Sequence, residues 1–141
     1  MSAHTAKAIV FTCMDERLEP AISRLIHSLE GGAFHAALAG GGAAFTFADD
    51  QATALKQVTA AYKINAITDV YLQSHTECGA YGLAGVTFAD APAEASRLYA
   101  DLDQAAAAIL AALADAGAQT GSVTVHTSVI TPAGDEVSRP A

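Results

Sequence analysis

The sequence predicts one α/β domain, residues 1–141, with a mainly parallel sheet and helices on both faces. The chain has 141 residues, of which 52% are apolar, and this is enough to bury a single core. Short apolar runs bounded by turn residues, which are typical of buried strands, alternate with longer segments of helical periodicity. Such alternation is typical of a parallel sheet with crossover helices. No linker, repeat or block of charge divides the sequence.

The first half of the chain is expected to run strand, helix, strand, helix. Residues 8–11 and 33–38 are the two apolar runs. Residues 18–29 predict the helix between them, which ends at Gly31-Gly32 and has one apolar face made by Leu18, Ile22, Leu25, Ile26 and Leu29. Residues 50–63 predict the second helix, on which Leu55, Val58 and Tyr62 align.

The second half repeats the pattern and adds a strand at the edge. Residues 67–72 and 123–130 are apolar runs and predict strands. Residues 93–116 predict a long helix, with Pro92 in its first turn, Gly117 at its end and an apolar face made by Leu98, Leu102, Ala105, Ile109 and Leu113. After the turn at 132–135, residues 136–138 are expected to return as a short antiparallel edge strand.

Composition excludes several classes of partner. Seven basic residues against fifteen acidic ones give a net charge of −8, and no basic cluster is present, so neither nucleic acid nor an anionic membrane is expected as a partner. No apolar run reaches the ~18 residues of a membrane span, and no secretory signal is visible. Two widely spaced cysteines indicate a reducing, cytoplasmic setting. High apolar content with 16% charged residues favours a homo-oligomer.

Chemistry-bearing residues follow the first and third predicted strands. In open α/β sheets, binding sites lie at the carboxyl ends of the strands, where Cys13, His75 and Cys78 are expected. Two thiolates and one imidazole form a set that zinc uses with its fourth position open. Copper is the softer alternative, although zinc is commoner at mixed sulfur and nitrogen sites. Alternatively, the cysteines are small buried apolar residues.

Asp15 and Arg17 follow Cys13 closely. In an extended segment, positions 13, 15 and 17 share one face. A carboxylate beside a metal either binds it or is held away by a guanidinium group, which leaves a position open for water. The alternative is an ordinary solvated ion pair.

The remaining polar features receive structural interpretations. His4, His27 and His35 are expected on the surface or on helix faces, and His126 within the core or an interface. Residues 40–42 are three glycines and are expected as a flexible loop at the site. They lack the Lys-Ser/Thr that would make them a phosphate-binding loop.

The segments Cys13-Met14-Asp15-Glu16-Arg17 and His75-Thr76-Glu77-Cys78-Gly79 together resemble the β-class carbonic anhydrases. Residues 34–40 are similar in position to the second strand of that family and its Arg-Asn-Ala-Gly loop, with Ala37-Leu38 in place of Arg-Asn. The resemblance implies a Rossmann-like core of four parallel strands with an added antiparallel edge strand. It also implies a homodimer, or a higher homo-oligomer, with its sites near the interface.

The resemblance further implies roles for five residues. Cys13, His75 and Cys78 would bind one zinc ion per chain, and Asp15 and Arg17 would form the pair that controls its fourth position. The implied reaction is the reversible hydration of carbon dioxide to bicarbonate. Three alternatives remain open: hydrolysis of a related small molecule such as carbonyl sulfide, a zinc-binding protein without catalysis, and an α/β interaction domain whose cysteines coincide by chance.

Overall fold

The computed structural model describes residues 3–141, which form a five-stranded sheet in the order β2-β1-β3-β4-β5. The strands are β1 (Ala8–Thr12), β2 (Phe34–Ala37), β3 (Asp69–His75), β4 (Thr124–Ile130) and β5 (Glu136–Val137). Strands β1 to β4 are parallel, and β5 pairs antiparallel with β4. The predicted α/β fold, with a parallel core and an antiparallel edge strand, is confirmed.

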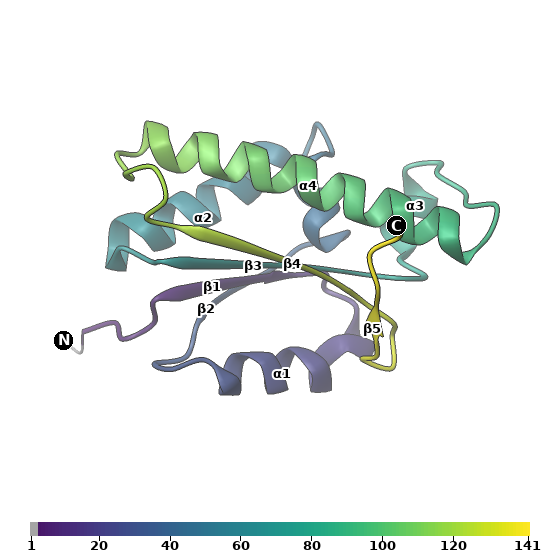
Figure 1. Ribbon diagram of the computed structural model, residues 1–141, viewed down its shortest axis with the longest axis horizontal. Coiled ribbons are helices and arrows are strands. Elements are labelled where there is room, and N and C mark those ends of the chain that lie inside the picture. Colours follow the sequence, from purple (N-terminus) through teal and green to yellow (C-terminus); the bar gives the residue numbers. More distant parts are fainter. Residues whose placement is uncertain (1–2) are drawn as a thin grey trace.

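Helices cover both faces of the sheet, as predicted. Figure 1 shows α1 (Glu19–Ser28) on one face and α2 (Gln51–Asn65) with α4 (Ala91–Asp115) on the other. Three shorter elements are η1 (Glu16–Leu18), η2 (Gly41–Phe45) and α3 (Gly79–Leu83). Within residues 3–141, no helix combines the length and the apolar character needed to cross a membrane.

The core forms where the predicted apolar faces meet the central strands. All five residues of β1 are buried, as expected for a parallel strand covered on both faces. The predicted α4 face, made by Leu98, Leu102, Ala105, Ile109 and Leu113, is buried throughout. Helix α4 begins after Asp90, whose carboxylate accepts the Ala93 N–H at 2.8 Å and so caps the helix.

The third strand is longer than predicted. The apolar run ends at residue 72, but β3 continues to His75, which pairs with Ile130 of β4. Gln73 and Ser74 are polar and end the apolar run from which the strand is predicted, although both residues are buried. Because of this extension, His75 is the last residue of β3 that pairs with β4.

The glycine run is part of the packed interior, so the expected flexible loop is wrong. Gly41 and Gly42 begin η2 and are buried. Gly41 has a φ of +54°, and a Cβ there would lie 2.5 Å from the carbonyl oxygen of Gln73. A Cβ on Gly42 would lie 2.3 Å from Cδ2 of Leu102 on α4. Because η2 packs this closely against β3 and α4, glycine is needed at both positions.

Candidate metal centre

Adjacent parallel strands bring the three predicted ligand residues to one edge of the sheet. Cys13 follows β1 directly, His75 ends the neighbouring strand β3, and Cys78 is the residue before α3. One donor atom from each residue lies within 4.8 Å of the other two. The three side chains are buried, with exposures of 5%, 1% and 8% for Cys13, His75 and Cys78.

The geometry of this cluster fits a tetrahedral metal ion. The two Sγ atoms are 3.9 Å apart, and sulfurs bound to zinc at about 2.3 Å lie about 3.8 Å apart in a tetrahedron. Nδ1 of His75 lies 2.8 Å from the Thr76 carbonyl oxygen, to which its N–H donates in the tautomer that leaves Nε2 free to bind metal. Among the described residues, that buried Nε2 has no hydrogen-bond partner. The residues present therefore fit zinc.

Hydrogen bonds favour a thiolate at Cys13. The hydrogen bond from the Cys78 thiol lowers the pKa of Cys13 and outweighs its burial, and the Gly40 N–H, 3.4 Å from Cys13 Sγ, adds to this effect. The same hydrogen bond to Cys13, together with burial, raises the pKa of Cys78. Burial lowers the pKa of His75, but the neighbouring Cys13 side chain and its charge as a thiolate raise that pKa by more, so the net shift is upward.

Asp15 and Arg17 form a closely bonded pair, as predicted, but the backbone conformation between them is not the predicted extended one. The segment is not extended through position 17, because Asp15 caps η1 and Arg17 lies within it. Oδ1 of Asp15 accepts the Arg17 backbone N–H and Nε–H, each at 3.0 Å, and Oδ2 accepts Nη2–H at 2.7 Å. The Arg17 side chain lowers the pKa of Asp15 to about 2, with its backbone N–H contributing.

The Asp15 carboxylate faces the donor cluster without joining it. Its Oδ2 lies 3.8 Å from Nε2 of His75, and the same oxygen accepts Nη2–H of Arg17 at 2.7 Å. The Asp15 side chain is 13% exposed against 45% for Arg17, so the carboxylate is better shielded from solvent than its partner. The guanidinium group thus holds the carboxylate beside the donor cluster.

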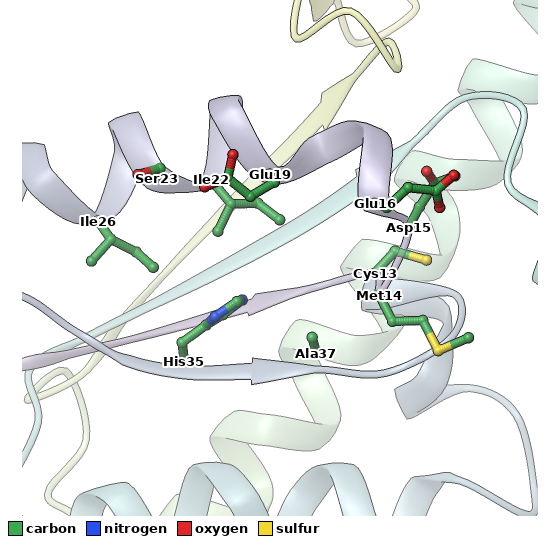
Figure 2. A pocket seen from close by; sticks show the side chains of 10 residues that line it. All are labelled: Cys13, Met14, Asp15, Glu16, Glu19, Ile22, Ser23, Ile26, His35 and Ala37. Atoms are coloured by element: carbon green, nitrogen blue, oxygen red, sulfur yellow. The ribbon is translucent and has the colours of Figure 1, made fainter.

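Two hollows open on the cluster from solvent. A cavity of about 610 Å³ lies between α1 and the sheet, where Figure 2 shows the Cys13 sulfur and the Asp15 carboxylate at one end and His35 on β2. A second cavity, of about 440 Å³, is lined by Ala39, Gly79, Ala80 and Leu83. Cys13, Met14, Asp15 and Glu16 line both cavities. A small molecule can therefore reach the Asp15 side of the cluster along apolar walls.

The other histidines lie outside the cluster. His4 and His27 are exposed, as expected. His35, on β2, is also exposed as expected, with Nε2 3.0 Å from the Thr12 hydroxyl. His126 was expected in the core or an interface; it is partly exposed, lies 2.8 Å from an Asp69 oxygen and stacks on Tyr71.

Several solved structures share this arrangement of strands and helices. The β-carbonic anhydrase of Aspergillus fumigatus superposes with a TM-score of 0.59 at 13% identity, over 99% of this chain and 78% of the other. The carbonic anhydrase of Streptococcus mutans gives 0.55 at 16% identity, over 98% and 84%. The fold is that of the β-carbonic anhydrases.

A carbon disulfide hydrolase shares this fold. Its apo form superposes with a TM-score of 0.55 at 17% identity, over 97% of this chain and 80% of the other. No protein-family model matches the chain, and no curated protein matches its sequence. The β-carbonic anhydrase fold is therefore established by the three-dimensional arrangement.

Within the β-carbonic anhydrase fold, the structure adds contacts that the sequence did not predict. The Gly40 N–H reaches Cys13 Sγ, the Glu77 carbonyl oxygen accepts Nη2–H of Arg17 at 3.3 Å, and Glu94 accepts the Glu77 N–H. The glycine run signalled that the backbone approaches closely there. Glu94 gave no such signal, because an acidic residue in the first turn of a helix is ordinary.

Proposed function

We propose that this chain is a zinc-dependent enzyme that hydrates carbon dioxide reversibly to bicarbonate, with Cys13, His75 and Cys78 binding one zinc ion per chain. The observation that carries the proposal is the buried, unpartnered Nε2 of His75 beside two thiol sulfurs 3.9 Å apart, with an ion-paired carboxylate on the open side. The motif resemblance and the fold support it.

A zinc ion held by these residues acts as a Lewis acid that lowers the pKa of water towards neutrality. The protein's part is to position the water and the carbon dioxide. Oδ2 of Asp15, 3.8 Å from His75 Nε2, accepts a hydrogen bond from the attacking water and directs its lone pair towards the substrate. The apolar wall formed by Met14, Ala39 and Leu83 suits an uncharged molecule without hydrogen-bond donors.

Arg17 supports this role in two ways. Its hydrogen bonds keep Asp15 ionised, so the carboxylate acts as an acceptor at every physiological pH. They also occupy both carboxylate oxygens, which would keep Asp15 from binding the metal itself. A metal held by the three ligands would then keep a position for water, and hydration of carbon dioxide releases one proton to solvent for each bicarbonate formed.

Hydrolysis of carbonyl sulfide or carbon disulfide is the second candidate. Both molecules are linear and uncharged like carbon dioxide, and the wall of the second cavity includes the apolar Ala80 and the exposed Leu83. The carbon disulfide hydrolase of the same fold supports this alternative.

We also propose that the active form is a homodimer or a higher homo-oligomer in the cytoplasm. Met14 and Leu83 are 71% and 92% exposed beside the proposed site, and a second copy of the chain would cover such an apolar rim. Cys13 and Cys78 are free thiols, which a reducing compartment preserves.

The decisive assay is stopped-flow hydration of carbon dioxide from about pH 6 to about pH 9, which brackets the pKa of metal-activated water. We expect activity in zinc-loaded protein, its loss with a chelator and its return with zinc. Cys78→Ser is expected to bind zinc poorly and to remain inactive. Sulfide release from carbonyl sulfide, measured in parallel, tests the second candidate. Zinc-loaded protein without activity on either substrate would leave the non-catalytic zinc-binding alternative.

A further inference from the structure

The turn that joins His75 to Cys78 has an unusual backbone. Glu77 has a φ of +58°, in the left-handed region that residues other than glycine rarely adopt. This turn sets the separation of His75 Nε2 and Cys78 Sγ, because only two residues lie between them. The conformation therefore needs support from elsewhere in the fold.

Three hydrogen bonds hold the turn, each from a different element. The Thr76 N–H donates to the carbonyl oxygen of Ile130 at 3.0 Å, which extends the pairing of β3 with β4. The Glu77 carbonyl oxygen accepts Nη2–H of Arg17 at 3.3 Å, and the Glu77 N–H donates to Oε1 of Glu94 at 2.7 Å. The left-handed residue is thus held on both sides of its Cα.

Glu94 belongs to a face of α4 that contacts this part of the chain at two separate points. Glu94 and Asp101 are seven residues apart, so they lie on one side of the helix. Asp101 accepts the hydroxyl hydrogen of Tyr81 at 2.6 Å and so fixes α3. The first turn of α4 lies near α3, at the carboxyl ends of the strands (Figure 1). Glu94 therefore contacts the turn, whereas Asp101 contacts α3.

We propose that Glu94 is a positioning residue for the metal centre, whose carboxylate holds the Glu77 N–H and thereby sets the spacing of His75 and Cys78. The inference rests on the proposed zinc site. Without this acceptor, the turn relaxes from its left-handed conformation, and the two donor atoms lose their fixed separation. The Glu77 carbonyl also loses its fixed position against Arg17, which connects the turn to Asp15.

The test compares zinc affinity, measured by competition with a chromophoric chelator, in the wild type and three variants. Glu94→Ala removes the acceptor and is expected to weaken zinc binding about tenfold, the low end for residues that support metal ligands. Glu94→Gln keeps an acceptor oxygen without the charge and is expected to restore near wild-type affinity. Asp90→Asn, the control, removes a charge from the same end of α4 while retaining an equivalent cap.

Cobalt-substituted protein supplies a second readout. At saturating cobalt, we expect the visible spectrum of Glu94→Ala to differ from that of the wild type, and Glu94→Gln to keep the wild-type spectrum. If Glu94→Ala binds zinc with wild-type affinity, the role of Glu94 is overturned while the proposed zinc site stands. The same holds if Glu94→Gln loses as much zinc affinity as Glu94→Ala. A wild-type chain that binds no zinc would overturn the proposed zinc site with it. If Glu94→Ala does not fold, Glu94→Asp, one methylene shorter, is expected to weaken binding instead.

Discussion

In the proposed mechanism, Asp15 decides whether a metal bound by the cluster keeps an open position. Its two oxygens accept hydrogen bonds from the backbone N–H, Nε–H and Nη2–H of Arg17, and its Oδ2 lies 3.8 Å from His75 Nε2. A carboxylate held in this way stays ionised and remains next to the donor atoms. The proposed hydration activity depends on this acceptor more directly than on any other residue that does not bind the metal.

Asp15→Asn is expected to keep zinc and to lose most hydration activity. The amide has nearly the same shape, but it carries no charge and can accept at only one of its two terminal atoms. General acid–base groups contribute about 10²- to 10⁴-fold to rates, and we expect a fall in kcat in that range. Stopped-flow hydration together with zinc content measures both effects. Unchanged kcat would remove Asp15 from the mechanism.

The same ion pair makes a defined contribution to acid stability. Arg17 lowers the pKa of Asp15 from its usual 3.8 to about 2, so protons bind the unfolded state more readily than the folded state in this range. The stabilisation is fully present above about pH 4 and is lost as the pH falls towards 2. In metal-free protein, the difference in unfolding free energy between the wild type and Asp15→Asn should shrink over that interval. A constant difference would contradict the pairing.

For individual residues, the sequence predicts which side chains belong to the candidate site better than it predicts their geometry. Cys13, His75 and Cys78 could be selected because strand ends and short spacing bring them together. Asp15 and Arg17 could be selected as a pair, but the spacing suggests an extended backbone where η1 forms. Glu94 could not be predicted, because its contact with Glu77 exists only once α4 packs beside the turn.

Short elements rather than long ones position the site. Element η2 inserts Gly41 against the ends of β1 and β3, where a Cβ would lie 2.5 Å from the Gln73 carbonyl oxygen and 3.0 Å from the Cys13 nitrogen. The preceding Gly40 donates its N–H to Cys13 Sγ. Packing of η2 and hydrogen bonding of the thiolate are therefore parts of one arrangement.

Gly41→Ala is expected to destabilise the fold by about 1–3 kcal/mol, the usual cost of overpacking an interior, with the positive φ adding to it. Gly82→Ala is the matched control, because Gly82 lies in α3, has a φ outside the left-handed region and has open space where a Cβ would lie. That substitution should be neutral or stabilising, since alanine favours helix. Urea unfolding measures both variants, and equal stabilities would contradict the packing argument.

Element length explains which parts of the fold the sequence could predict. The long helices and the four parallel strands could be predicted because each shows a period or an apolar run. Elements η1, η2 and α3 have three to five residues each, too few to show a period. The end of β3 could not be predicted because Gln73 and Ser74 are polar, although pairing with β4 buries them.

The whole molecule combines a net charge of −8 with an apolar rim beside the proposed site. Met14 and Leu83 are the two most exposed large apolar side chains in the described part of the chain, and both line the second cavity. Covering this rim would remove apolar surface from water and enclose the approach to Asp15. Assembly and activity are therefore expected to depend on each other.

We expect light scattering at micromolar concentration to give at least a dimer. Leu83→Glu places a charge on the apolar rim and should shift the protein towards monomer while leaving its unfolding midpoint nearly unchanged, because the side chain is exposed. Ile64→Glu, at an exposed position near the end of α2, is the control and should keep the wild-type mass. A monomeric wild type would contradict the proposed assembly.

X-ray absorption at the zinc edge tests the central claim most directly, because it reports the atoms bound to the metal whatever the rate of turnover. For protein loaded with one zinc ion per chain, the account predicts two sulfurs at about 2.3 Å and lighter atoms, including one imidazole nitrogen, at about 2.0–2.1 Å. The Cys13→Ser variant should lose one sulfur or the metal itself. A shell of nitrogen and oxygen alone in the wild-type protein would contradict the assignment of Cys13, His75 and Cys78 as the zinc ligands.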